Sequence, residues 1–169
     1  MPLNKLPTKM SAGFGLSMID RAVKEFHATR CSVVELRTVH EYFRHNGGLQ
    51  CIYCRQADAT RWDHLHPVSR GGDTVPGNLV PACGSCDDSK QDREVDEWIQ
   101  GGSAKRPASH HAARINEEIE LYRSKFKYEP KPFVEKLSEK QKAAYTAFQG
   151  ELRLLRQHLQ EAGLLKAKR

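Results

Sequence analysis

Two cysteine motifs, CIYC at residues 51–54 and CGSC at residues 83–86, decide the fold of this 169-residue chain. In each motif two residues separate the cysteines, a spacing that is typical of zinc sites. Four thiolates in two such pairs complete a tetrahedral zinc site and leave no position open for water. We therefore expect structural Zn²⁺, with an iron–sulfur centre as the less favoured alternative, on Cys51, Cys54, Cys83 and Cys86.

The stretch between and just after these motifs predicts a small α+β core. Residues 60–68 and 79–82 have the composition of two short strands, and SRGGDTVPGN at 69–78 is rich in turn residues. Residues 87–100 have the pattern of a helix that ends at two glycines. The expected order is therefore strand, loop, strand and helix, pinned by zinc at one end.

An adjacent carboxylate and imidazole, Asp63 and His64, lie within this core. An imidazole with an ordinary pKa near 6.5 is largely neutral at pH 7 and can accept a proton from water. A hard cation such as Mg²⁺ prefers oxygen ligands, which Asp63 and Asp87 supply. Because neighbouring side chains on an ideal strand point to opposite faces, some further feature must bring Asp63 and His64 to one site.

The order C-x-x-C, D-H-x-x-P-x-S-x-G-G and N-L-V-P-A-C-x-x-C over residues 51–90 resembles the HNH endonuclease family. This resemblance implies the ββα-metal fold, also called the His-Me finger, with a four-cysteine zinc. It implies that His64 is the general base, that Asp63 binds the catalytic cation, and that Asn78 braces the loop and orients the base. The implied products carry 5′-phosphate and 3′-hydroxyl ends.

The third position of the family motif is usually His or Asn, whereas this chain has Asp87. The extra negative charge should keep or strengthen binding of Mg²⁺ or Mn²⁺, so we expect Asp87 to be a metal ligand. The resemblance further implies that Lys90 contacts phosphate. Arg61, Arg70 and His66 are the other candidates for contact with the nucleic acid, although a lone Arg is more often a solvated surface charge.

The net charge of +6 is distributed unevenly. The balance of Lys and Arg over Asp and Glu is +3 in residues 1–50, −4 in residues 51–100 and +7 in residues 101–169. A core with that acidic balance is poorly suited to hold a polyanion unaided. We therefore expect the basic flanks to supply most of the affinity for double-stranded DNA.

The flanks are predicted to be helical, which gives a helical N-terminal flank at 1–49, the nuclease core at 50–101 and a basic extension at 102–169. Apolar spacing predicts helices at 16–29, 33–45, 110–127 and 138–162, and residues 101–109 have the composition of a linker. Ser32 is a candidate N-cap, and Ser138 with Gln141 fits a capping box.

The segment 138–163 is also a candidate dimerisation helix. Its apolar residues alternate in steps of three and four, as in a coiled-coil seam, at Tyr145, Phe148, Leu152, Leu155, Leu159 and Ala162. Packing of this face within the chain itself is an equally good interpretation. We expect no secretory signal and no membrane span, and a cytoplasmic location in which Cys31 remains a reduced thiol.

The sequence leaves three functions open. The first is a metal-dependent DNA endonuclease, of restriction type or from a phage or mobile element. The second is a catalytically silent, zinc-stabilised module that binds nucleic acid. The third is an interaction protein whose terminal helix recruits partners. The presence of Asp63, His64 and Asn78 favours the first, because a module that only binds has no physical need for them.

Overall fold

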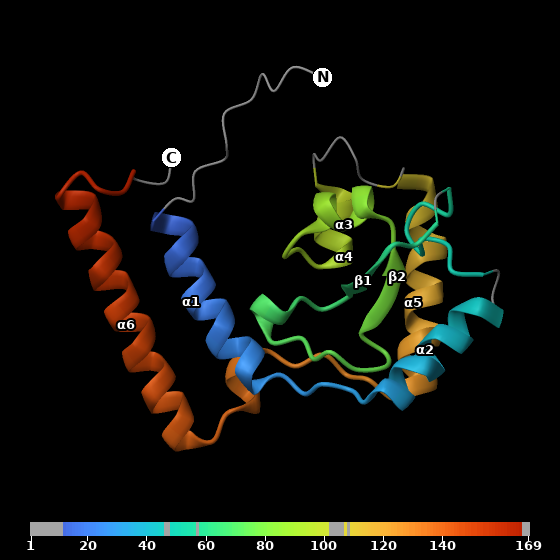
Figure 1. Cartoon of the computed structure of the whole chain (residues 1–169), viewed down its shortest axis with the longest axis horizontal. Helices are drawn as coiled ribbons and strands as arrows, with labels where there is room; N and C mark the ends of the chain where they lie inside the picture. Colours follow the sequence, from blue (N-terminus) through green and yellow to red (C-terminus); the bar gives the residue numbers. More distant parts are fainter. Residues whose placement is uncertain (1–11, 46–47, 57, 102–106, 108, 167–169) are drawn as a thin grey trace, which may run out of the picture. The chain divides into compact units, whose positions relative to one another are not determined.

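The computed structural model describes residues 12–45, 48–56, 58–101, 107 and 109–166. The chain forms two compact units, one from residues 24–136 and one from the two ends of the chain, residues 1–23 and 137–169. Figure 1 shows the elements of both units. Most of the predicted linker, residues 102–106 and 108, lies outside the described residues. The unit of residues 24–136 contains both cysteine motifs.

A two-stranded antiparallel sheet lies at the centre of this unit. Strand β1 (Arg61–His64) pairs with β2 (Leu79–Ala82), with Asp63 opposite Val80 and His64 opposite Leu79. The first strand is shorter than the predicted 60–68 because the chain turns after His64 into a 3-10 helix at Val68–Arg70. The α+β core with helical flanks is confirmed.

Two short helices follow β2 where the sequence predicts one helix at 87–100. Helix α3 (Gly84–Lys90) begins directly after Cys83, and α4 (Val95–Gln100) follows after a break. At the break Gln91 has a φ of 54°, and Glu94 forms a capping box with Glu97 that starts α4. The early start of α3 places Cys86 one turn after Cys83, so both thiols of the second motif can reach the first.

The core of the unit is built where α2 (Val33–His45) and α5 (Ala112–Phe126) pack on the sheet and α4. Its largest fully buried side chains include Trp98, Tyr53 and Tyr122. The bounds of α2 agree with the prediction, and Ser32 caps it, since its hydroxyl accepts a hydrogen bond from the Glu35 amide at 3.2 Å. The helix predicted at 110–127 is present as α5, preceded by a 3-10 turn at Ser109–His111.

The second unit contains a pair of helices, α1 (Ala12–His27) and α6 (Glu139–Glu161), which lie side by side in Figure 1. Only the part of α1 up to Val23 belongs to this unit. Asp20 accepts hydrogen bonds from Tyr145 and Gln149, at 2.8 and 2.5 Å, and the predicted capping box of Ser138 and Gln141 is present. No residue of α6 is fully buried. Among the described residues, no helix is long and apolar enough to cross a membrane.

Candidate metal and nuclease site

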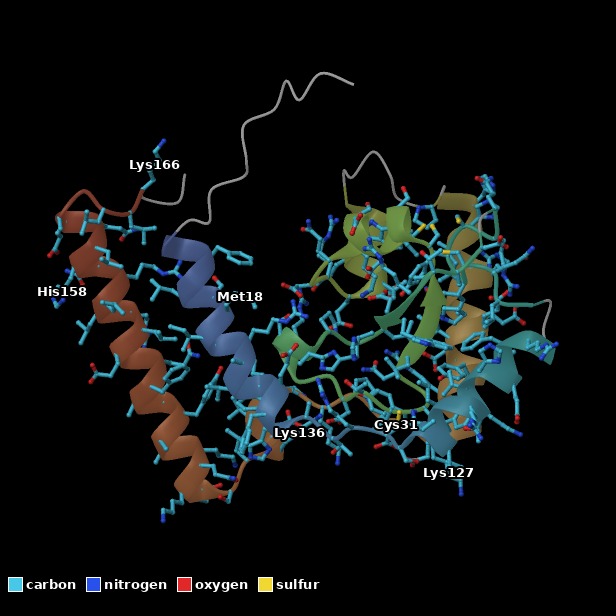
Figure 2. All side chains as sticks on the ribbon, viewed as in Figure 1. Met18, Cys31, Lys127, Lys136, His158 and Lys166 are labelled. Carbon is cyan, nitrogen blue, oxygen red and sulfur yellow. The ribbon has the colours of Figure 1, made fainter. Side chains whose placement is uncertain are left out.

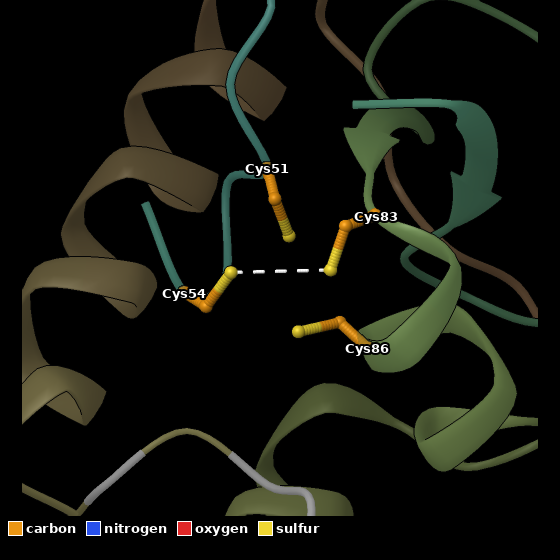
Figure 3. Close-up of side chains that lie close together, drawn as sticks. All are labelled: Cys51, Cys54, Cys83 and Cys86. Carbon is orange, nitrogen blue, oxygen red and sulfur yellow. Dashed lines mark hydrogen bonds between the residues drawn. The ribbon is translucent and has the colours of Figure 1, made fainter. Parts of the chain in front are cut away.

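The four cysteines form a single cluster, as predicted. Their sulfur atoms all lie within 4.8 Å of one another, and Figure 3 shows the side chains pointing toward a common centre. The Sγ atoms of Cys54 and Cys83 are 3.9 Å apart. Sulfurs bound to one tetrahedral zinc at about 2.3 Å are separated by about 3.8 Å, so these residues fit Zn²⁺.

Hydrogen bonds already favour thiolate at the centre of the cluster. A hydrogen bond from Cys86 lowers the pKa of Cys51 to about 4, with further help from the amides of Cys54, Cys83 and Tyr53. The same contact raises the pKa of Cys86. Cys31, the fifth cysteine, lies apart from the cluster (Figure 2), and burial raises the pKa of its thiol.

Asp63 points into the core and not to the surface. Its side chain is 8% exposed, and its Oδ2 accepts a hydrogen bond of 2.5 Å from the hydroxyl of Tyr53. Its Oδ1 accepts the backbone N–H of His64 at 2.8 Å. Burial raises the pKa of Asp63, opposed by Lys90 and Tyr53 and supported by the negative charge of Asp87.

Lys90 is the cationic partner of Asp63 and is fully buried. Its Nζ lies 3.2 Å from Asp63 Oδ2 and donates a hydrogen bond of 2.7 Å to the carbonyl of His64. A side chain with 0% exposure cannot contact a phosphate in this arrangement. The structure thus differs from the expected phosphate contact, because the charge of Lys90 is used to offset the buried carboxylate.

His64, at the end of β1, is only partly buried. Its Nε2 lies 2.9 Å from the hydroxyl of Thr74, in the loop between the strands. Asp63 and His64 point to different sides of the strand, as alternation requires, and the Asp63 carboxylate reaches His64 only through the backbone N–H.

Asn78 is fully buried and braces the loop, as the family resemblance implies. Its Oδ1 accepts the N–H of His66 at 2.7 Å, and its Nδ2 donates to the carbonyls of His66 and Asp73 at 3.0 and 2.7 Å. These three bonds close residues 66–78 into a compact loop. Its main chain also meets the end of β1, since its carbonyl accepts the N–H of Leu65, the residue after His64, at 2.9 Å.

Asp87, on α3, is partly exposed and is paired with an arginine. The guanidinium of Arg61 lies 2.9 Å from Asp87 and 2.5 Å from Asp88. Hydrogen bonds to both carboxylates raise the pKa of Arg61. Arg61 is 48% exposed, so this pair borders the solvent, and incoming phosphate would compete with Asp87 and Asp88 for the guanidinium.

His66 and Arg70 are bound within the protein. His66 is buried, and its Nδ1 lies 2.7 Å from Glu94, whereas its Nε2 has no hydrogen-bond partner among the described residues. Arg70 makes two bonds of 2.7 and 2.6 Å to Glu97, which lowers the pKa of Glu97. Tyr53, Thr74 and Glu94 were not predicted as partners of these residues, because residue type and spacing carry no signal for such long-range contacts.

The oxygen ligands of a catalytic cation are less complete than the zinc ligands. Asp63 and Asp87 have the chemistry that Mg²⁺ or Mn²⁺ prefers, but Tyr53 and Lys90 contact the first and Arg61 the second. Within the described ranges, the four cysteines are the only cluster of three or more metal-binding side chains. The chemistry of the two carboxylates fits the cation, and each carboxylate is also paired with a side chain of the protein.

Comparison with known proteins gives one match. Residues 51–93 match the family model described as HNH endonuclease, which covers both cysteine motifs, both strands, α3 and the break after it. No curated protein and no solved structure matches the chain.

Proposed function

From the HNH endonuclease domain formed by residues 51–93, we propose that this protein is a metal-dependent DNA endonuclease. The domain itself indicates a nuclease or a nucleic-acid-binding role. Hydrolysis is favoured by one observation above others: His64 is partly accessible at the end of β1, directly after Asp63, and its Nε2 lies 2.9 Å from the hydroxyl of Thr74.

His64 is proposed to take the proton from the attacking water. Its neutral imidazole can do so at pH 7, which contributes roughly 10²- to 10⁴-fold to such reactions. Asp63 and Asp87 would hold Mg²⁺ or Mn²⁺, which stabilises negative charge on the phosphorane and the leaving 3′-oxygen. Asn78 keeps the loop closed, and Lys90 holds the buried carboxylate in place.

The proposed substrate is double-stranded DNA bound mainly by the basic flanks. The core segment 51–100 has a charge balance of −4, whereas residues 101–169 have +7. Arg61, whose side chain is 48% exposed, is the cation that we expect to reach a phosphate. Arg70 is also exposed but is paired with Glu97. A restriction, phage or mobile-element origin and a cytoplasmic location, suited to reduced thiolates, belong to the same proposal.

A plasmid assay tests this function. Zinc-loaded protein should convert supercoiled plasmid to nicked or linear DNA with added Mg²⁺ or Mn²⁺, and not in their absence. His64→Ala should lower the rate at least 10²-fold with DNA affinity unchanged. His110→Ala, an exposed histidine, is the matched control and should cut like wild type. Wild-type cleavage by His64→Ala would overturn the assignment of the base.

A catalytically silent nucleic-acid-binding module is the alternative. It is favoured by the protein cations that already occupy Asp63 and Asp87. Under this alternative the zinc-loaded protein would shift the mobility of a DNA duplex while leaving the plasmid intact with either cation. The same two measurements therefore separate the two functions.

We also propose a homodimer through the α1–α6 helix pair. Apolar side chains stay substantially exposed on both helices, among them Met18 on α1 and Leu154 and Leu155 on α6. Two copies would let two sites cut both strands of a palindrome. Light scattering should give a mass near twice 19.2 kDa for wild type and near 19.2 kDa for Leu152→Glu/Leu159→Glu. A monomer in both samples would refute the dimer.

A further inference from the structure

The hydroxyl of Thr74 lies at hydrogen-bonding distance from a ring nitrogen of His64. The Nε2–Oγ1 distance is 2.9 Å. Thr74 lies ten residues from His64, on the far side of the loop that follows β1. A hydroxyl can accept a hydrogen bond from an imidazole N–H, and the neutral ring then carries its lone pair on the other nitrogen.

The backbone of Thr74 is held on both sides by the segment that joins α1 to α2. The N–H of Thr74 donates to the carbonyl of Thr29 at 2.8 Å, and the N–H of Cys31 donates to the carbonyl of Thr74 at 2.7 Å. Arg30 and Thr74 thereby form a parallel β-bridge. The hydroxyl thus projects from a main chain that is fixed by residues outside the segment matched by the family model.

The preceding residue, Asp73, anchors the same point of the loop to both flanks. Its Oδ1 accepts the N–H of Thr29 at 2.8 Å, and its Oδ2 lies 2.5 Å from the Nζ of Lys136, labelled in Figure 2. Its carbonyl accepts the side-chain amide of Asn78 at 2.7 Å. The ion pair is largely buried, with 18% and 16% of the two side chains exposed, so solvent screens it little.

We propose that Thr74 is a positioning residue for His64, and that the Thr29–Cys31 segment and the Asp73–Lys136 ion pair hold it in place. The Nε2–H of His64 donates to the Thr74 hydroxyl, and this contact fixes the orientation of the ring that takes the proton of water. This role rests on the proposed nuclease function. It gives the two basic flanks a second task, because they fix the loop that orients the base.

The test compares Thr74→Val, which removes the hydroxyl at nearly constant volume, with Thr74→Ser, which keeps it. On plasmid with saturating Mg²⁺, Thr74→Val should lower kcat about tenfold with KM within about twofold of wild type, and Thr74→Ser should recover most of the loss. Thr38→Val is the matched control, since it removes a hydroxyl whose described hydrogen bond, to the Glu35 carbonyl at 2.7 Å, lies within α2. It should leave kcat unchanged.

A second readout does not need activity. An imidazole N–H held by a hydrogen bond exchanges slowly enough to give a proton NMR signal, which His64→Ala identifies by its loss. We expect this signal in wild type and Thr74→Ser and its absence in Thr74→Val. If Thr74→Val is less stable than Thr74→Ala, judged by thermal unfolding, Thr74→Ala replaces it in both measurements.

The two readouts separate the inference from the function on which it rests. A wild-type protein that shows the signal but never cuts DNA refutes the nuclease and leaves the hydrogen bond established. An unchanged kcat in Thr74→Val, or a signal that survives in that variant, overturns the positioning role.

Discussion

The two ends of the core that matches the HNH family model hold their candidate metal ligands differently. At one end four sulfurs converge within 4.8 Å of one another. At the other end Asp63 is bonded to Tyr53 and Lys90, and Asp87 to Arg61. The four thiols form a complete set of zinc ligands, whereas the two carboxylates are paired with other side chains of the protein.

The difference follows from the free energy needed to bury each kind of group without a partner. In the cysteine cluster a hydrogen bond from Cys86 stabilises the thiolate of Cys51, and a neutral thiol packs as a small apolar group, so the four sulfurs need no partner from outside the cluster. A buried carboxylate is costly unless it is paired with a cation or with hydrogen-bond donors. Lys90 and Tyr53 meet that need at Asp63, and Arg61 meets it at the more exposed Asp87.

Breaking the zinc end should have the largest effect. Structural zinc in small domains contributes on the order of 10 kcal/mol to folding, and the described sheet has only two strands. We expect Cys86→Ser to lose bound zinc and the cooperative unfolding transition of the core, measured by metal analysis and circular dichroism. Cys31→Ser is the matched control and should retain both, since Cys31 lies outside the cluster. Zinc retained at full stoichiometry in Cys86→Ser would contradict a four-cysteine site.

Disrupting the carboxylate end should reduce the free energy of unfolding by less than loss of the zinc site does, but by a measurable amount. Lys90→Met leaves the buried Asp63 without its cation and should reduce the free energy of unfolding by about 3 kcal/mol. The double variant Asp63→Asn/Lys90→Met removes both charges and should lose clearly less than Lys90→Met. Urea unfolding of zinc-loaded protein measures both, with Lys140→Met on α6 as an exposed control. Equal losses in the single and double variants would show that the two charges do not interact.

Two neighbouring aspartates sharpen the comparison at the exposed carboxylate. Asp87 and Asp88 both pair with Arg61, but only Asp87 is proposed as a metal ligand. Asp87→Ala should raise the Mg²⁺ concentration for half-maximal cleavage about tenfold or more, and Asp88→Ala should leave it nearly unchanged. The same shift in both variants would mean that the pairing with Arg61, and not metal binding, controls the response.

The smallest predicted effect concerns the link between the two ends. Tyr53 stands between Cys51 and Cys54, and its hydroxyl bonds Asp63 at 2.5 Å. Tyr53→Phe keeps the ring against Trp98 and should reduce stability by about 1 kcal/mol. It should also raise the Mg²⁺ requirement for cleavage while zinc content stays at wild-type level. If neither the stability nor the Mg²⁺ requirement changes in Tyr53→Phe, the hydroxyl of Tyr53 does not link the cysteine cluster to Asp63.

The sequence predicted those features that depend on local residue order. The cysteine spacing, the strand at 79–82, the bounds of α2 and the capping box at Ser138 all follow from neighbouring residues, and each is present. The break between α3 and α4 was missed, although Glu94 and Glu97 already have the spacing of a capping box.

The partners of the site residues could not be predicted in this way. Tyr53 meets Asp63 across 10 positions, Glu94 meets His66 across 28 and Lys90 meets Asp63 across 27. Such pairs depend on tertiary packing, and one sequence carries no record of it. Lys90 is the plainest example, since its motif position implied phosphate contact whereas packing placed it inside the core.

The α1–α6 helix pair has a consequence for the order in which the chain folds during synthesis. Its two halves come from opposite ends of the chain, with the whole of residues 24–136 between them. Domains generally fold as units while the ribosome adds residues from the N-terminus onward. The core can therefore complete its sheet and capture zinc before α6 is synthesised, and the pairing of Asp20 with Tyr145 follows the folding of the core.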